Sequence, residues 1–219
     1  MRPYYEDDVV VIYHGDCREI APSLTFDVVV TDPPYGVALD TTRTTRQPRR
    51  SKAGTLRTGR SHAPIAGDHS EFDPRSWLAY PCAFTGANYF AHHLPRNGRW
   101  HVWDKTNRGE APTGLNNEFE MVWTSWPSGR SVILPILWAG VARINKHPNS
   151  FQHPSQKPES LFVWIINSAP PGVIIDPYMG SGSTLRAAKD MGRRAIGIEL
   201  DERYCEIAAK RMAQEVLAL

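Results

Sequence analysis

Short runs of β-branched apolar residues, each followed at once by acidic, proline or glycine residues, constrain the fold of this chain most. The run at residues 26–30 leads into the Asp-Pro-Pro-Tyr segment Asp32–Tyr35, and the run at 173–175 leads into Asp176–Thr184, which contains Gly-Ser-Gly. Runs this short and apolar are typical of parallel strands that are buried on both faces. Ligands of open α/β sheets bind at the carboxyl ends of the strands, so the sequence predicts that both segments lie at a binding edge.

The remaining pattern predicts further strands and helices in alternation. Strands are expected at residues 9–13, 100–103, 118–126 and 195–200, and helices at 74–94, 159–167, 183–191 and from the cap Asp201 to about residue 215. The helix at 74–94 is expected to have Asp73 as its cap and Pro74 in its first turn, while Pro81 indicates a break or a later start. Large apolar side chains of the strands are expected in the core: Trp100, Trp103, Phe119, Met121, Trp123 and Trp126.

The length of 219 residues fits one α/β domain with a single core. Two stretches, at about 38–73 and 127–152, are expected to be irregular inserts within that domain. The first is rich in Thr, Arg, Ser, Gly and Pro, and the second is interrupted by the apolar residues 132–141. Long loops of this kind in compact domains are usually functional or disordered.

Charge is distributed unevenly along the chain. The formal net charge of +2 does not by itself indicate a polyanionic partner, but residues 43–60 contain seven basic residues and no acid. These residues are Arg43, Arg46, Arg49, Arg50, Lys52, Arg57 and Arg60. Basic side chains that neutralise phosphates release counterions, so this basic arm is expected to contact a nucleic-acid backbone; a solvated loop is the alternative. A second basic surface is expected from Arg130, Arg143 and Lys146.

The cysteines and the apolar runs exclude other classes of protein. Cys17, Cys82 and Cys205 lack metal-ligand spacing, so we expect neither a zinc site nor disulfides, and a reducing cytoplasmic setting. No apolar run approaches the length of a membrane span, so we expect a protein that is not exported and has no membrane partner.

Three motifs in a fixed order resemble the signature of S-adenosylmethionine-dependent DNA amino-methyltransferases. They are Asp32–Tyr35, the His-Pro-Ser-Gln-Lys-Pro segment His153–Pro158, and the glycine turn after Asp176. With the catalytic tetrapeptide first and the cofactor loop last, the chain resembles the permuted β group, which methylates adenine N6 or cytosine N4. The resemblance implies a Rossmann-like fold with a mostly parallel seven-stranded sheet and helices on both faces. It also implies S-adenosyl-L-methionine as cofactor and double-stranded DNA as partner, in a bacterial or phage modification enzyme, and leaves a homodimer open.

The resemblance implies that Asp32, Pro33, Pro34 and Tyr35 are catalytic, and the chemistry agrees. The exocyclic amine of a base is a poor nucleophile because its lone pair is delocalised into the ring. Asp32 and the Pro33 carbonyl would accept its hydrogens and aim the lone pair at the methyl group. Two prolines hold this turn rigid without competing donors. Tyr35 would stack on a base flipped out of the duplex.

The resemblance also implies a cofactor site around the glycine turn. Glycines let the backbone approach a ligand, and the absence of a following Lys excludes a P-loop. Asp176 would complement positive charge, Glu199 would accept the ribose hydroxyls, and Asp16 would contact the adenine amino group. The expected cofactor residues are Asp16, Asp32, Ser155, Lys157, Asp176, Tyr178, Gly180, Ser181, Gly182, Ser183, Thr184, Glu199 and Leu200.

Three alternatives remain beside adenine N6 methylation. Cytosine N4 methylation is the nearest, but Asp32 favours adenine because the cytosine enzymes of this family often have Ser there. Methylation of a protein glutamine amide would require Asn at this position and the opposite motif order. A non-catalytic DNA-binding protein with a vestigial pocket is the third.

Overall fold

The computed structural model describes residues 1–36, 70–106, 117–126, 129–138 and 157–214. The chain divides into two compact units, residues 1–33 with 73–219 and residues 34–72, and all the helices and strands given below lie in the first. Most of both predicted inserts lies outside the described residues, so the single-domain organisation stays a prediction. Within the described ranges, no helix combines the length and apolar character needed to cross a membrane.

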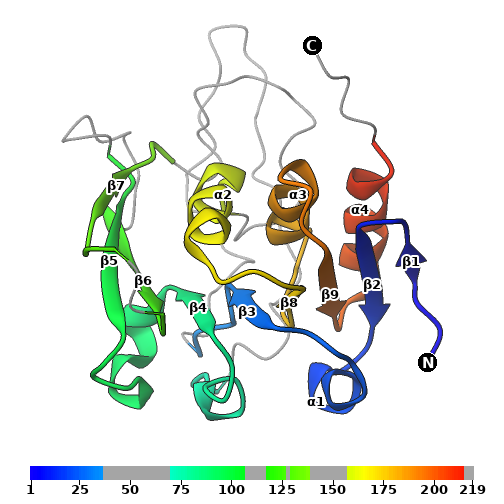
Figure 1. Cartoon of the computed structure of the whole chain (residues 1–219), viewed down its shortest axis with the longest axis horizontal. Coiled ribbons are helices and arrows are strands. Elements are labelled where there is room, and N and C mark those ends of the chain that lie inside the picture. The colour runs from blue at the N-terminus through cyan, green and yellow to red at the C-terminus, as the bar shows by residue number, and fades with distance from the viewer. Residues whose placement is uncertain (37–69, 107–116, 127–128, 139–156, 215–219) are drawn as a thin grey trace, which may run out of the picture. The chain divides into compact units, whose positions relative to one another are not determined.

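A single mixed sheet forms the centre of the first unit, with the order β1-β2-β9-β8-β3-β4-β6-β5-β7 (Figure 1). Its strands are β1 (Tyr5–Glu6), β2 (Val10–His14), β3 (Val28–Thr31), β4 (Cys82–Thr85), β5 (Arg99–Asp104), β6 (Phe119–Thr124), β7 (Ile133–Pro135), β8 (Ile174–Asp176) and β9 (Ala195–Glu199).

The pairing of the strands confirms the predicted mostly parallel sheet. Neighbouring strands from β2 through β9, β8 and β3 to β4 are parallel, and so are β5 and β7. Strand β6 is antiparallel to both β4 and β5, and β1 is antiparallel to β2. The seven strands from β2 to β5 match the expected number, and the sheet gains one short strand at each edge, β1 and β7. Each of these two edge strands pairs with a single neighbour, and neither was expected from the sequence.

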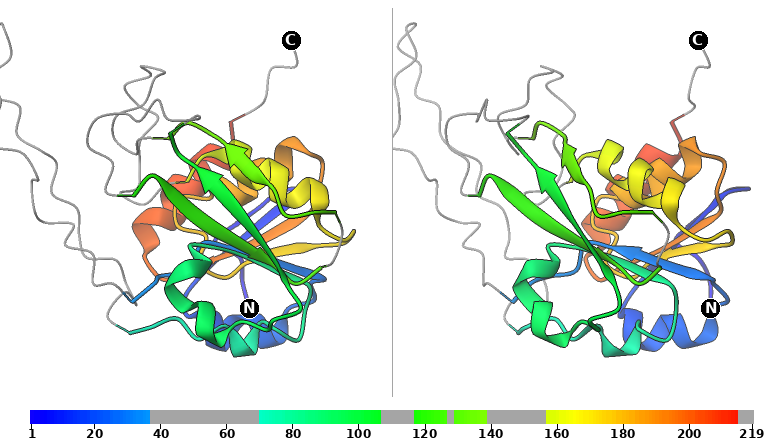
Figure 2. Two further views of the ribbon diagram at one scale, coloured as in Figure 1. Left: turned by 90° about the vertical axis from the view of Figure 1, so that its left-hand side faces the viewer. Right: turned by 60° about the vertical axis from the view of Figure 1, so that its left-hand side comes forward.

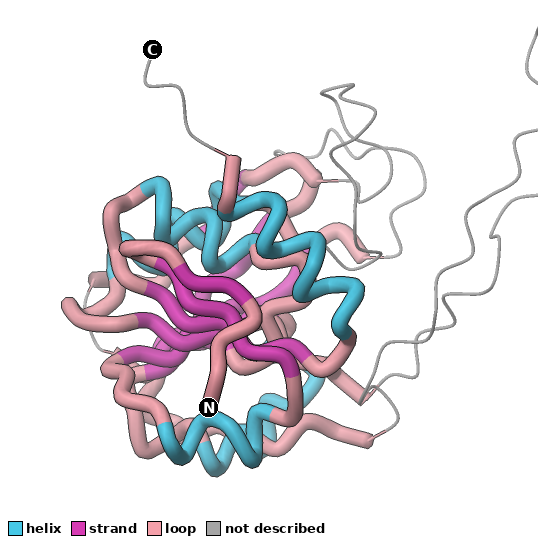
Figure 3. Tube along the Cα trace, turned by 90° about the vertical axis from the view of Figure 1, so that its right-hand side faces the viewer, coloured by secondary structure: helices cyan, strands magenta, loops and turns pink. Residues whose placement is uncertain are grey.

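Helices lie on both faces of the sheet, as predicted (Figure 3). On one face α2 (Glu159–Ser168), α3 (Ser183–Asp190) and α4 (Glu202–Met212) lie side by side (Figure 1). On the other are α1 (Cys17–Ile20) and the 3-10 helices η1 (Ala21–Ser23), η2 (Pro74–Ser76) and η3 (Ala87–His93). Figure 2 shows that the sheet twists along its width, so that the green strands β5 and β6 cross the blue strand β3 at an angle.

The core confirms most of the expected apolar positions. Trp103, Trp123 and Trp126 are buried, as are the β-branched residues of β3 and the inner faces of α2 and α3. Trp100 is half-buried. The exceptions are Phe119, which is 53% exposed, and Met121, which is half-buried.

The expected helix at 74–94 is wrong. Asp73 does cap a short helix, because its side chain accepts the Arg75 N–H at 3.0 Å, but the helix ends after one turn. Cys82–Thr85 is instead the central strand β4, fully buried between β3 and β6. A proline precedes it, and its four residues have little strand pattern of their own. Pairing with two neighbours and burial on both faces decided its conformation.

Candidate active site at the carboxyl ends of the parallel strands

Parallel pairing brings the predicted acidic residues to one edge of the sheet. Strand β8 lies between β3 and β9, and β9 in turn pairs with β2. The carboxyl ends of these four strands therefore present Asp32, Asp176, Glu199 and Asp16 along the same edge. Asp176 is linked to the residue before Asp32, because the Thr31 hydroxyl donates to Asp176 Oδ1 at 2.6 Å.

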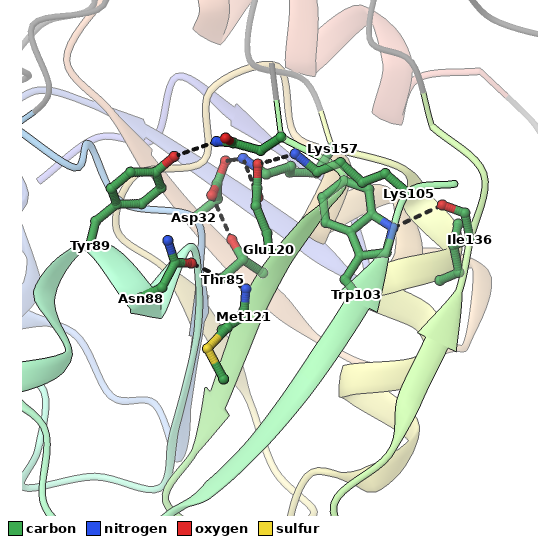
Figure 4. Close-up of polar contacts among 11 residues, drawn as sticks. Asp32, Thr85, Asn88, Tyr89, Trp103, Lys105, Glu120, Met121, Ile136 and Lys157 are labelled. Atoms are coloured by element: carbon green, nitrogen blue, oxygen red, sulfur yellow. Dashed lines mark hydrogen bonds and ion pairs between the residues drawn. The ribbon is translucent and has the colours of Figure 1, made fainter. Parts of the chain in front are cut away.

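Asp32 is held by two donors from distant parts of the chain (Figure 4). The Thr85 hydroxyl of β4 donates to Oδ1 at 2.5 Å, and the Lys157 ammonium donates to Oδ2 at 2.7 Å. Lys157 is buried, which by itself lowers its pKa, but the nearby Asp32 and Glu120 carboxylates raise the pKa above its ordinary value. The ammonium is therefore charged, and it fixes the Asp32 carboxylate in one position.

Lys157 was expected among the cofactor residues, and its ammonium pairs with Asp32, another residue of that set, so its contact with the cofactor stays a prediction. Its neighbour in the motif, Ser155, lies outside the described residues. Pro33 is buried directly after Asp32. Pro34 and Tyr35 belong to the second compact unit, so their catalytic roles stay predictions.

Asp176 is a buried carboxyl group at the end of β8. Besides the Thr31 hydroxyl, the Tyr178 N–H donates to its Oδ1 at 3.1 Å, and Thr184 also hydrogen-bonds to it. Removal from water outweighs these bonds and raises the pKa of Asp176 to about 7. The carboxyl group is therefore poised between its neutral and charged forms near neutral pH.

The glycine turn adopts a backbone that only glycine takes up easily. Gly180 and Gly182 have φ values of 51° and 78°, and Gly182 is the residue before α3. The Arg211 guanidinium of α4 donates to the Ser181 carbonyl at 2.5 Å and lies 3.3 Å from its hydroxyl. At the start of α3, Ser183 and Thr184 are buried. The hydrogen bonds from Arg211 thus hold the glycine turn against α4.

Glu199 joins the glycine turn to the end of β9. Its Oε2 accepts the Gly180 N–H at 2.9 Å, and its Oε1 accepts the Asp201 N–H at 2.8 Å. Burial raises the pKa of Glu199 above its ordinary value. The next residue, Leu200, is 54% exposed at the same edge. Together these residues form an acidic strand end beside a glycine turn.

Asp16 and Tyr178 complete the edge. Asp16 caps α1 by accepting the Arg18 N–H at 2.9 Å, and the Arg18 side chain holds the pKa of Asp16 below its ordinary value. Burial raises the pKa of Tyr178, whose ring meets the buried Trp77 edge-on at 6.5 Å between centroids. The Tyr178 hydroxyl stays protonated.

Sequence reasoning missed two residues that contact the charged centre. Thr85 lies on β4, which was taken for a helix, so its side chain had no expected direction. Glu120 lies on a strand whose other residues are mostly apolar, and an acid in such a strand was the available signal. The Glu120 carboxylate can be buried because it forms ion pairs with Lys105 and Lys157.

The predicted DNA contacts are largely outside the described residues. This holds for the whole basic arm at residues 43–60 and for Arg143 and Lys146. Arg130 is described and is exposed. These contacts, a homodimer and a cytoplasmic location stay predictions.

Comparison with known proteins places the chain in a family. A family model described as DNA methylase, for N6 and N4 methyltransferases, matches residues 95–210, more than half of the chain. The chain therefore belongs to the N6/N4 DNA methylase family, and the resemblance seen in its motifs is confirmed.

Individual relatives agree with this assignment. The chain is 28% identical to the type II methyltransferase M.ScaI of Streptomyces caespitosus, over 100% of its own length and 86% of that protein. It is 40% identical over 87 residues to the type II methyltransferase M.HinfI of Haemophilus influenzae, which is 39% of this chain and 24% of that protein.

Solved structures confirm the fold. The M1.HpyAVI complex with SAM superposes with a TM-score of 0.54 at 21% identity, covering 94% of this chain and 100% of that one. The cytosine-N4-specific PvuII DNA methyltransferase superposes with a TM-score of 0.57 at 15% identity, covering 99% of this chain and 91% of that one.

Proposed function

We propose that this DNA methyltransferase transfers a methyl group from S-adenosyl-L-methionine to N6 of a flipped-out adenine in double-stranded DNA. The observation that carries the proposal is the Asp32 carboxylate, which Thr85 and Lys157 hold at the end of the strand next to β8 and its glycine turn. An acceptor of defined position beside a glycine turn is what amine methylation requires.

The cofactor is S-adenosyl-L-methionine, which supplies a methyl group carried on a positively charged sulphur. The residues at the edge fit it. The positive φ values of Gly180 and Gly182 let the backbone come close to a ligand, and the buried Ser183 hydroxyl has no hydrogen-bond partner among the described residues. Glu199 offers carboxylate oxygens to ribose hydroxyls, and Asp176 offers negative charge.

Asp32 would act on the target amine by position. Each carboxylate oxygen has two lone pairs, so the bonds from Thr85 and Lys157 leave capacity for an amine hydrogen. With the Pro33 carbonyl as second acceptor, the nitrogen lone pair would be drawn out of the ring and held in one direction. The amine becomes acidic only as the new bond forms, so its proton can leave afterwards, to Asp32 or to water. Asp32 therefore needs placement more than basicity.

Binding of DNA is proposed to use residues beyond this centre. Tyr35 would stack on the flipped base and offset part of the cost of extrusion, which is a few kcal/mol. The basic arm and Arg130, Arg143 and Lys146 would neutralise phosphates.

The choice of adenine over cytosine is supported by Asp32, since cytosine-N4 enzymes of the family often have Ser at this position. To test it, DNA is incubated with the protein and radiolabelled S-adenosylmethionine and then digested to nucleosides. We expect label in N6-methyldeoxyadenosine. Label in N4-methyldeoxycytidine would show that the target is cytosine N4 and not adenine N6. DNA binding without any label would identify a non-catalytic DNA-binding protein.

A further inference from the structure

Asp32 is one end of a row of four charged side chains of alternating sign (Figure 4). Lys105 Nζ lies 2.5 Å from Glu120 Oε1, Lys157 Nζ lies 3.6 Å from Glu120 Oε2, and Lys157 Nζ lies 2.7 Å from Asp32 Oδ2. The four side chains are between 8% and 18% exposed. Only the Asp32 end of this row belongs to the strand-end motifs, and Glu120 belongs to none of the motifs described above.

Burying such a row is costly unless every charge has a partner. Removing an ammonium or a carboxylate from water costs several kcal/mol, which an ion pair repays only with good geometry. Lys157 achieves this with two carboxylates, Asp32 and Glu120. Lys105 holds the other oxygen of Glu120 and also lies 5.0 Å from the centre of the Trp103 ring. Glu120 therefore cannot turn away from Lys157 without leaving Lys105 unpaired.

One bond in the row is incomplete. Glu120 Oε2 is buried and has no hydrogen-bond partner among the described residues, although the Lys157 ammonium is only 3.6 Å away. A buried acceptor without a donor is unfavourable, and an ammonium has three donors to offer. A small movement of Lys157 Nζ away from Asp32 would complete this bond.

We infer that Glu120 is a positioning residue for methyl transfer, which takes over the Lys157 ammonium when the target amine hydrogen-bonds to Asp32. The inference rests on the proposed role of Asp32. Methylation of the amine creates positive charge on its nitrogen, and an ammonium held on the same carboxylate competes with that charge. Moving the ammonium towards Glu120 leaves the negative charge of Asp32 facing the amine.

The backbone around Glu120 is suited to this role. The N–H of the next residue, Met121, donates to the Asn88 side-chain oxygen at 3.2 Å, which ties β6 to η3. On the other side β6 is paired with β5 along six residues. The carboxylate of Glu120 therefore projects from a rigid element, while the long side chain of Lys157 is the part that can move.

The substitution Glu120→Gln tests the inference, because it keeps the shape of the side chain and removes its charge. We expect kcat to fall about ten- to a hundred-fold, the effect of losing a hydrogen bond between charged groups, with the KM for S-adenosylmethionine unchanged. In a Lys157→Met background, the same substitution should change kcat by less than about twofold, because Glu120 acts only through Lys157. Additive effects of the two substitutions would overturn the inference.

Asp7→Asn is the matched control. Asp7 also receives a lysine, since the Lys189 ammonium lies 2.5 Å from its Oδ2, with the two side chains 24% and 23% exposed, but it lies between β1 and β2 at the far edge of the sheet. We expect this variant to lower the melting temperature and to leave kcat unchanged. A Glu120→Gln variant that behaves in the same way would show that Glu120 is only structural.

Two further measurements keep the outcomes separate. If Glu120→Gln does not fold, Glu120→Asp keeps the charge but draws the carboxylate back from Lys157, so kcat should still fall, and a wild-type kcat in this variant would overturn the inference. If the wild-type protein methylates no DNA, the proposed function itself fails, whereas an active wild type and an equally active Glu120→Gln variant reject only the role of Glu120.

Discussion

At the scale of single residues, the defining feature is a carboxylate whose position is set by a buried ammonium. Asp32 lies at a strand end, but its orientation comes from Thr85 and Lys157, which are 53 and 125 residues away in the sequence. Both partners leave the carboxylate able to accept a further hydrogen. This arrangement fits the role proposed for Asp32, which depends on where its carboxylate is placed.

The Asp32→Ala variant should lose methyl transfer by about a hundred-fold or more, because one preorganised acceptor of the amine is removed. Binding of S-adenosylmethionine, measured by calorimetry, should change little, since the glycine turn and Glu199 are untouched. Asp32→Asn serves as the control of similar shape and should be almost as inactive. Wild-type rates in Asp32→Ala would remove this residue from the mechanism.

Asp176 should make cofactor binding depend on pH. Its pKa of about 7 means that the folded protein binds a proton there below neutral pH, and the positive charges of the cofactor favour the ionised form. Affinity should therefore rise as the pH increases through about 7, with release of a proton on binding at lower pH. Titration calorimetry in two buffers of different ionisation enthalpy measures both effects, which Asp176→Asn should abolish.

The same raised pKa has a consequence for stability without cofactor. The carboxyl group ionises in the unfolded chain at about pH 4 and in the folded protein only at about pH 7. Its contribution to the stability of the folded protein is therefore fully present below about pH 4 and is lost as the pH rises through about 7.

In the calorimetric titration, a cofactor affinity that does not change with pH would show that Asp176 does not face the bound cofactor.

At the scale of elements, the close packing of α3 on the sheet fixes the glycine turn. Gly197 of β9 makes room for this, because a Cβ there would lie 2.4 Å from Met179 Sδ and 2.6 Å from Leu185 Cδ2. Met179 belongs to the turn itself, and Leu185 lies on α3. The absence of a side chain on β9 thus decides how near the turn comes to Glu199.

Replacing Gly197 by Ala should destabilise the protein by about 1–3 kcal/mol, as other overpacked cores do, and should weaken cofactor binding by moving the turn. Gly192→Ala is the control, because a Cβ there meets nothing within 4 Å and only the left-handed backbone is strained. Denaturant unfolding measures the loss of stability, and titration calorimetry measures the affinity for the cofactor. Unchanged cofactor affinity in a destabilised Gly197→Ala variant would contradict the link between this contact and the turn.

Which elements could be predicted depended on how much of their stability is local. The helices α2, α3 and α4 were expected within a few residues of their observed bounds, because their apolar stripes and the Asp201 cap of α4 are short-range features. Strand β4 was not, because its strand conformation comes from pairing with β3 and β6. The edge strands β1 and β7 were not expected either, because their conformation comes from pairing with β2 and β5.

At the scale of the whole molecule, recognition of DNA is proposed to separate backbone binding from chemistry. The basic arm lies outside the described residues, and its role is predicted from charge alone. Replacing Arg49 and Arg50 together by Ala should lower DNA affinity and reduce the slope of log K against log salt by about 2.

Lys210→Ala provides the control for this measurement. Its side chain is 71% exposed and pairs with Glu206 on α4, so it should leave the salt slope unchanged. Binding is followed by fluorescence anisotropy at several salt concentrations. An unchanged slope in the double variant would show that the basic arm is a solvated loop that does not contact DNA phosphates.

The sequence by itself determined the chemistry at each strand end and the order of the motifs, since these depend on neighbouring residues whose conformation is largely local. Only the tertiary structure decided which charged groups meet. The Lys157 ammonium lies on the Asp32 carboxylate, and Glu120, which belongs to none of the predicted motifs, is buried between two lysines. The physical reason is that a charge removed from water takes whichever opposite charge the packing brings near, and those partners come from strands and loops that are distant in the sequence.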